Sequence, residues 1–170
     1  MTRRRIVRPD GLAVRSSSPR RRRTPPRGFT LGELLLTAAV LLTILGIGIA
    51  IYRDYVSEAK NAVAIADITL LGNEIVLYQR QRGALPDTLA DLGRGSMRDP
   101  WGSPYEYLNL ASAAPGLARK DRFLVPLNSD YDLYSRGPDG NTAAPLTAQQ
   151  SRDDIVRAND GAFVGLASEF

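Results

Sequence analysis

The chain has 170 residues, of which 44% are hydrophobic and 24% are charged, and it contains neither cysteine nor histidine. This length fits one domain with extensions. The missing residue types exclude disulfide bonds, thiol nucleophiles and zinc sites with sulfur or imidazole ligands, and they remove the commonest general base near neutral pH. We therefore expect a protein that is not an enzyme.

The charge is distributed unevenly along the chain. Residues 1–28 hold ten arginines and one aspartate, a net charge of +9, whereas residues 29–170 carry a net charge of −5. Arginine runs can bind nucleic acid through phosphate contacts. Here the run directly precedes an apolar segment, which is typical of a positive flank that stays in the cytoplasm during membrane insertion. The pattern predicts a cytoplasmic arm and no nucleic-acid partner.

An uncharged, largely apolar run follows at residues 34–52. As a helix it would be roughly 28 Å long, close to the hydrocarbon thickness of a bilayer. It is also longer than the apolar region of an ordinary secretory signal peptide. The run therefore predicts a single membrane crossing.

A helical pattern continues beyond this run. No proline occurs between Arg27 and Leu85, so no residue there breaks a helix. Apolar residues recur at spacings of three and four, which predicts one buried stripe: Ile65, Ile68, Leu71, Ile75 and Tyr78. Gly83, with Pro86 after it, is a suitable C-cap. We expect one helix over residues 30–82 whose second half packs on a folded head.

The head, residues 83–170, has frequent turn signals. Short strands are predicted at 105–110, 123–125 and 131–135, because these segments are rich in aromatic and β-branched residues and are bounded by Gly, Pro, Asn or Asp. The expected fold class is α+β, with a long transmembrane and amphipathic helix packed on a small antiparallel sheet.

The junction between arm and helix reads Gly-Phe-Thr-Leu-Gly-Glu, from Gly28 to Glu33. A basic arm, this motif and an apolar helix, in that order, resemble the processing signal of type IV pilins and pseudopilins. The resemblance implies that a prepilin peptidase cleaves after Gly28 and methylates the new amino terminus on Phe29. It also implies four segments: a cleaved basic leader at 1–28, a transmembrane and assembly helix at 29–52, its amphipathic continuation at 53–82, and a periplasmic head with a C-terminal acidic loop at 83–170.

Glu33 lies at the edge of the apolar run, where an ionised carboxylate is costly unless it has a partner. In the resembled family this glutamate pairs with the amino terminus of an adjacent subunit, and cleavage would create that ammonium group on Phe29. Attraction between the two charges would be strong in a low dielectric. The alternative is that Glu33 only stabilises the helix amino terminus through the helix dipole.

Two segments of the head extend the resemblance to the major pseudopilin of type II secretion systems. Residues 99–107 read Asp-Pro-Trp-Gly-Ser-Pro-Tyr-Glu-Tyr, and residues 132–140 read Asp-Leu-Tyr-Ser-Arg-Gly-Pro-Asp-Gly. Two prolines, a glycine and Trp101 make the first segment a plausible core turn that offers an apolar surface to the helix. We interpret it as structural and not as a binding site.

A calcium site is implied by the same resemblance. The matching positions are Asp139, Asp153 and Asp154, and calcium needs six to eight oxygen ligands, so backbone carbonyls would have to complete the site. The sequence departs from the family pattern through a longer stretch, Asn141 to Arg152, between these aspartates. The alternative interpretation is a turn at Asp139 and a short helix that starts near residues 151–154.

The resemblance implies a pseudopilin subunit in the inner membrane with its head in the periplasm. Its expected partners are copies of itself, minor pseudopilins, the prepilin peptidase, the inner-membrane assembly platform and the lipid bilayer. One alternative is a pilin or minor pilin of a type IV pilus. A second is an unprocessed, signal-anchored periplasmic protein with a binding or enzymatic head, which would keep residues 1–28.

Overall fold

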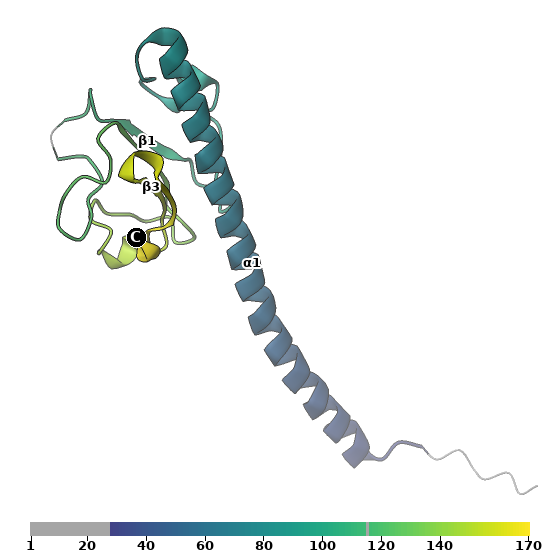
Figure 1. The fold of residues 1–170 in the computed structure, drawn as a ribbon. Helices are drawn as coiled ribbons and strands as arrows, with labels where there is room; N and C mark the ends of the chain where they lie inside the picture. Colours follow the sequence, from purple (N-terminus) through teal and green to yellow (C-terminus); the bar gives the residue numbers. More distant parts are fainter. Residues whose placement is uncertain (1–27, 115) are drawn as a thin grey trace, which may run out of the picture. The chain divides into compact units, whose positions relative to one another are not determined.

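A computed structural model describes residues 28–114 and 116–170 of the chain. The basic leader expected at residues 1–28 lies outside the described residues, with the exception of Gly28. The chain divides into two units, Met1–Thr43 and Ile44–Phe170. Helix α1, Leu31–Arg82, belongs in part to each unit (Figure 1).

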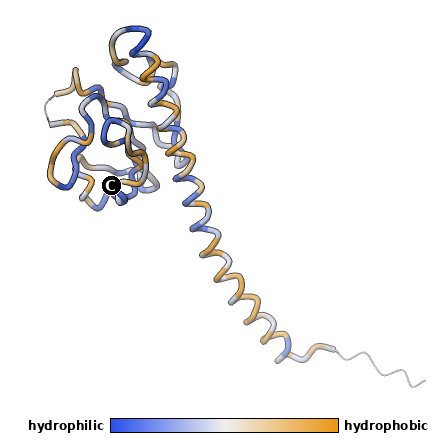
Figure 2. The backbone as a smooth tube through the Cα atoms, viewed as in Figure 1, coloured by the Kyte–Doolittle hydropathy of each residue, from blue (hydrophilic) through white to orange (hydrophobic). Residues whose placement is uncertain are grey.

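The first part of α1 is apolar on all sides. Every leucine, isoleucine and valine from Leu31 to Ile51 is exposed, and Figure 2 shows hydrophobic residues prevailing there, with hydrophilic residues mixing in further along. By length and composition, α1 can cross a membrane. A helix that is apolar all round needs lipid or other helices around it.

The end of α1 confirms the predicted C-cap. Gly83 has a φ of +75°, and its amide donates a hydrogen bond to the carbonyl of Gln79 at 2.8 Å. Glycine adopts this left-handed conformation without steric cost, so it can close the last turn of a helix. The predicted helix over 30–82 thus matches α1 within one residue at its start.

The head contains a four-stranded antiparallel sheet in the order β1-β2-β3-β4. The strands are β1 Glu106–Asn109, β2 Tyr131–Ser135, β3 Ile155–Ala158 and β4 Phe163–Leu166. The first two confirm the strands predicted at 105–110 and 131–135. The strands β3 and β4 were not predicted from the sequence. With α1 these strands confirm the expected α+β arrangement.

The strand predicted at 123–125 is wrong. Asp121 accepts hydrogen bonds from the amides of Phe123, at 2.7 Å, and Val125, at 2.9 Å, and Leu124 is left-handed with a φ of +62°. The carboxylate thus organises a turn in which Phe123, Leu124 and Val125 are exposed. Apolar and β-branched composition alone could not distinguish this exposed turn from a strand.

The two faces of the sheet bury two separate clusters. One cluster contains the buried stripe of α1, which consists of Ala64, Ile68, Leu71 and Ile75. This stripe packs against residues of the head: Tyr105, Tyr131, Leu133 and Ile155. Figure 1 shows the labelled strands β1 and β3 beside the second half of α1. The other cluster lies on the opposite face and contains Leu127, Leu146, Val156, Ala158 and Ala167. Alternation along β3, with Ile155 in the first cluster and Val156 in the second, explains this division.

The segment around Trp101 forms the turn that the sequence predicted. One oxygen of the buried Asp99 carboxylate accepts hydrogen bonds from the amides of Trp101, at 3.0 Å, and Ser103, at 2.8 Å. Its other oxygen accepts one from the Ser135 hydroxyl at 2.6 Å. Trp101 is partly buried against the α1 cluster. Asp99 therefore joins this turn to the end of β2.

Candidate functional site

The peptide bond expected to be cleaved lies just outside α1. Residues 28–30 have no regular secondary structure, and α1 begins at Leu31. Phe29 is 86% exposed, and no atom would lie within 4 Å of a Cβ at Gly28. A protease must bind its substrate in an extended form, so an exposed, non-helical bond ahead of a helix is chemically suited to cleavage.

Glu33 forms a reciprocal cap with Thr30 at the start of α1. Its Oε2 atom accepts hydrogen bonds from the Thr30 amide, at 2.8 Å, and from the Thr30 hydroxyl, at 2.9 Å. The Glu33 amide in turn donates to the Thr30 hydroxyl at 3.2 Å. Both bonds to the carboxylate go to one of its two oxygens. This arrangement holds the carboxylate beside the first turn of the helix.

The cap was missed because we considered only the helix dipole and the pairing with a neighbouring subunit. Thr-Leu-Gly-Glu, residues 30–33, has the spacing of a capping box, which requires Ser or Thr followed three residues later by Glu or Gln. The signal was therefore present in the sequence. The structure adds a specific partner, Thr30, to the general effect of the helix dipole.

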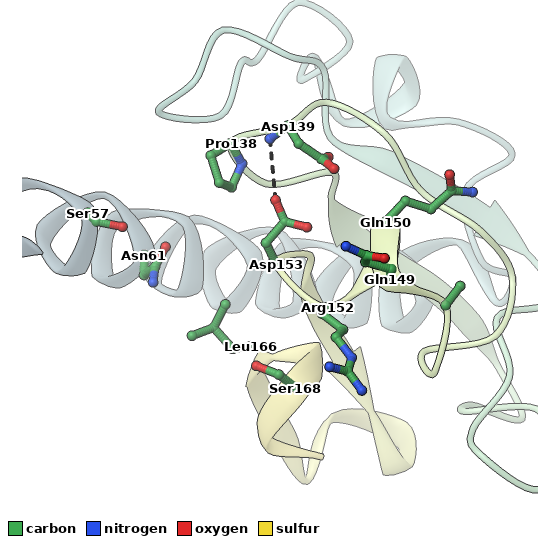
Figure 3. Close-up of a pocket in the computed structure, with 11 residues that line it drawn as sticks. Ser57, Asn61, Pro138, Asp139, Gln149, Gln150, Arg152, Asp153, Leu166 and Ser168 are labelled. Carbon is green, nitrogen blue, oxygen red and sulfur yellow. Dashed lines mark hydrogen bonds between the residues drawn. The ribbon is translucent and has the colours of Figure 1, made fainter.

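Two of the three aspartates expected to bind calcium lie close together. The amide of Asp139 donates a hydrogen bond to Oδ2 of Asp153 at 3.3 Å, and both residues line a cavity of about 740 Å³. Figure 3 shows this cavity, in which Ser57 and Asn61 of α1 face the loops of the head. Asp139 also accepts a hydrogen bond from the Asn141 amide at 2.7 Å.

Asp154 does not join them. Its side chain is fully buried and forms an ion pair at 2.6 Å with Arg119, whose side chain is also buried. The Thr142 hydroxyl donates a hydrogen bond to the same carboxylate oxygen at 2.6 Å. Burial raises the pKa of Asp154 to about 6, although Thr142 and Arg119 act in the opposite direction. Successive residues next to a strand point to opposite sides, which separates Asp153 from Asp154.

The acidic loop therefore offers fewer carboxylates than the resemblance implied. In residues 28–114 and 116–170, no three acidic, His or Cys side chains are grouped so that they could hold a metal ion. Calcium binding stays a prediction. The short helix proposed as the alternative near residues 151–154 is also only partly right, because a 3-10 turn covers Gln149–Ser151 and the chain then enters β3.

Arg119 carries no sequence motif that would single it out. It lies 35 residues before its partner Asp154, and no local spacing connects the two. Its role depends on the sheet, which brings the end of the 142–154 stretch beside the segment before β2. Only a tertiary structure could reveal this pair.

A curated protein is similar to much of this chain. The chain is 27% identical over 134 residues to the Type II secretion system core protein G of Pseudomonas aeruginosa, and the match covers 66% of this chain and 84% of that protein. The resemblance to type IV pilin-like proteins is confirmed. No protein-family model matches the chain, and no solved structure matches it significantly. The apolar start of α1 and this relative together fit a membrane-anchored protein of the periplasm.

Proposed function

We propose that this chain is a structural pseudopilin that assembles into a periplasmic filament of a type II secretion system after cleavage at Gly28 and methylation of Phe29. The observation that carries the proposal is the exposed Gly28–Phe29 bond directly before an apolar helix, in a chain similar to a secretion core protein. The chain acts by assembly and not by catalysis. Its head stays in the periplasm and α1 anchors it in the inner membrane.

The exposed side chains of α1 support assembly through this helix. From Leu31 to Ile51 its leucine, isoleucine and valine side chains are all exposed. In a membrane they would contact lipid, and in a filament they would pack against the helices of neighbouring copies. Burial of each such side chain is worth about 1.5–3 kcal/mol relative to water, so these residues strongly disfavour an aqueous, isolated helix.

Glu33 supplies the polar contact that would set the position of one copy against the next. After cleavage, the amino group of Phe29 becomes a cation, and the Glu33 carboxylate of a neighbouring copy can pair with it. Thr30 holds that carboxylate by one oxygen at the start of α1. A charge pair in a low dielectric favours the assembled form, because an unpaired charge there is costly.

As a pseudopilin, the chain would have several protein partners as well as the membrane. These are copies of itself and minor pseudopilins in the filament, the prepilin peptidase that cleaves it, the assembly platform of the inner membrane, and the bilayer. The basic leader serves insertion with its arginines in the cytoplasm, so nucleic acid is not among the partners.

The intact mass of the protein extracted from membranes tests the processing step. The expected mass lacks residues 1–28 and includes one added methyl group on Phe29. A strain without prepilin peptidase provides the control, and there the chain should keep its leader. A full-length mass in the peptidase-containing strain would instead support an unprocessed anchored protein.

Deletion of the gene tests the secretion role separately. Loss of a pseudopilin should leave exported proteins in the periplasm, and a plasmid copy of the gene should restore their release. If export continues while surface pili, motility or DNA uptake are lost, the chain is instead a type IV pilus subunit. The mass experiment cannot make this distinction, since both kinds of subunit are processed in the same way.

A further inference from the structure

Arg119 pairs with Asp154, one of the three aspartates at which a bound cation was expected. Its side chain is 4% exposed and that of Asp154 is fully buried, with 2.6 Å between the guanidinium and the carboxylate. The guanidinium also donates to the Thr142 hydroxyl, which itself donates to Asp154. The ring of Tyr134, on β2, lies beneath the guanidinium at 4.4 Å from its centroid. The positive charge therefore has an anion, a hydroxyl and an aromatic face around it.

The backbone holds Arg119 in this position from both sides. Its amide donates to the buried Asp132 carboxylate at 2.7 Å, and its carbonyl accepts from the Leu127 amide at 2.9 Å. The next residue, Lys120, pairs with the 142–146 segment: its amide donates to the Ala144 carbonyl at 2.8 Å, and its carbonyl accepts from the Leu146 amide at 2.9 Å. Arg119 is thus part of a hydrogen-bonded layer and not a mobile surface side chain.

That layer uses the longer stretch that distinguishes this chain from the family pattern. Thr142, Ala144 and Leu146 all belong to the stretch from Asn141 to Arg152. Leu146 adds its side chain to the cluster on the outer face of the sheet. The longer stretch therefore supplies the Thr142 hydroxyl to Asp154. Its backbone hydrogen bonds to Lys120 also hold the segment that contains Arg119 in place.

A fully buried carboxylate requires a compensating positive charge or hydrogen bonds. Arg119 supplies that charge from within the chain. Arg119 and Thr142 both contact one oxygen of the Asp154 carboxylate, while its other oxygen is buried without a hydrogen-bond partner among the described residues. A divalent cation at the first oxygen would have to displace the guanidinium, and one at the second oxygen would meet like-charge repulsion from it. Asp139 and Asp153 line the cavity shown in Figure 3, which Asp154 does not line. Their carboxylates therefore do not offset the repulsion between Arg119 and a cation at Asp154.

We propose that Arg119, together with Thr142, takes the place of a bound metal ion in the head, so that the 136–154 loop is held without calcium. The site expected at Asp139, Asp153 and Asp154 is then replaced by an internal ion pair. This proposal concerns the stability of the head and is independent of filament assembly. A chain that failed to assemble would still show it.

The test is thermal unfolding of the full chain in detergent, with millimolar calcium in one sample and EDTA in the other. The melting temperature of the wild-type chain should be the same in both samples. Arg119→Ala should lower it by about 10 °C or more, because it leaves a buried carboxylate unpaired. The control is Arg136→Ala, which breaks the more exposed pair with Glu106 and should lower it by less than about 4 °C.

Thr142→Val is the second variant, in case Arg119→Ala does not fold. It keeps the size of the side chain and removes the hydroxyl that contacts both Arg119 and Asp154. Its melting temperature should be lower than that of the wild type, equally in calcium and in EDTA. The proposal is overturned if EDTA lowers the wild-type melting temperature and calcium restores it. It is also overturned if neither Arg119→Ala nor Thr142→Val is less stable than Arg136→Ala.

Discussion

The hydroxyl of Tyr105 donates a hydrogen bond to the carboxylate of Asp67 at 2.7 Å. Tyr105 precedes β1 in the head, is 5% exposed and belongs to the cluster that packs on α1, whereas Asp67 lies on α1 itself. The two residues are 38 positions apart. A polar contact therefore accompanies the apolar packing between this helix and the head, and it gives that packing a defined position.

Replacement of Tyr105 by phenylalanine should lower the free energy of unfolding by about 1–2 kcal/mol, because Asp67 loses a partner while the ring stays in the cluster. Urea unfolding of the full chain in detergent measures this change. Tyr55→Phe is the matched control, since Tyr55 is 70% exposed on the same helix and its change should leave stability within about 0.5 kcal/mol of the wild type. Equal effects of the two changes would contradict a structural role for the contact.

The stability of the head should fall in alkaline solution. Burial raises the pKa of Tyr105 above its usual value of 10, and it does the same for Tyr107, Tyr131 and Tyr134. The unfolded chain releases these phenolic protons near pH 10, before the folded chain does. Their contribution to stability is therefore complete below pH 10 and is lost as the pH rises through the folded pKa values.

Melting temperatures between about pH 8 and pH 11 measure this loss. The decrease of the melting temperature with rising pH should be smaller for Tyr105→Phe than for the wild type, because one of the four phenols is absent. Tyr55→Phe should keep the wild-type slope, since Tyr55 is exposed. A melting temperature that is constant across this range would show that the four phenols are not shielded from titration by the fold.

Substitutions at Glu33 and Thr30 separate helix capping from charge pairing. Gln can take the place of Glu in a capping box but carries no charge. Glu33→Gln should therefore leave helix content unchanged and yet prevent filament assembly. Thr30→Val removes the hydroxyl that bonds to Glu33 while it keeps the carboxylate, so assembly should persist. Filament yield and circular dichroism are the two measurements.

The contrast between the two substitutions decides the role of Glu33. Assembly in Glu33→Gln at the wild-type level would show that the charge is unnecessary, and the proposed pairing with Phe29 would then fail. Gly28 and Phe29 stay unchanged in both variants. Their intact masses should therefore show that cleavage and methylation still occur, which excludes a processing defect as the cause.

Gly137 is a position where the fold demands glycine. It has a φ of +64°, and a Cβ there would overlap the backbone carbonyl of Asp153. Gly137→Ala should lower the free energy of unfolding by at least about 3 kcal/mol, because it adds an overlap with rigid backbone to an unfavourable conformation. Chemical unfolding measures the change.

Gly140→Ala provides the comparison for Gly137→Ala. Gly140 has a similar φ of +68°, but the nearest atom to its Cβ would be the Ser103 hydroxyl at 3.9 Å. Gly140→Ala should therefore lower the free energy of unfolding by only about 1–2 kcal/mol, which is the cost of the left-handed backbone conformation for alanine. If the two variants are equally stable, the close approach of residues 137 and 153 is absent in solution.

Local patterns were sufficient to predict the elements whose residues carry their own signal. The helix was predictable because apolar residues recur every three or four positions, prolines are missing and Gly83 follows. β2 was predictable because its aromatic and apolar residues lie between turn residues. The exposed turn at 123–125 looked like a strand for the same reason, since composition does not report that Asp121 folds the chain back on itself.

The last two strands were missed because their neighbours suggested something else. β3 contains Arg157, and Asp153 and Asp154 stand just before it, so the charges there favoured a turn or a helix start. The fold accommodates these charges because residues distant in the sequence form ion pairs with Arg157 and Asp154. Arg157 donates to Asp130 at 2.8 Å from both of its terminal nitrogens, and Arg119 pairs with Asp154.

The amino-acid sequence by itself determined the basic arm, the apolar helix with its Gly28–Glu33 junction, and the pilin-like resemblance. These features depend on the order and spacing of neighbouring residues. Only the tertiary structure decided which aspartate forms an ion pair with Arg119 and which ones line the cavity beside Ser57 and Asn61. Those outcomes depend on contacts between segments tens of residues apart, and their energies arise from burial that exists only once the sheet has formed.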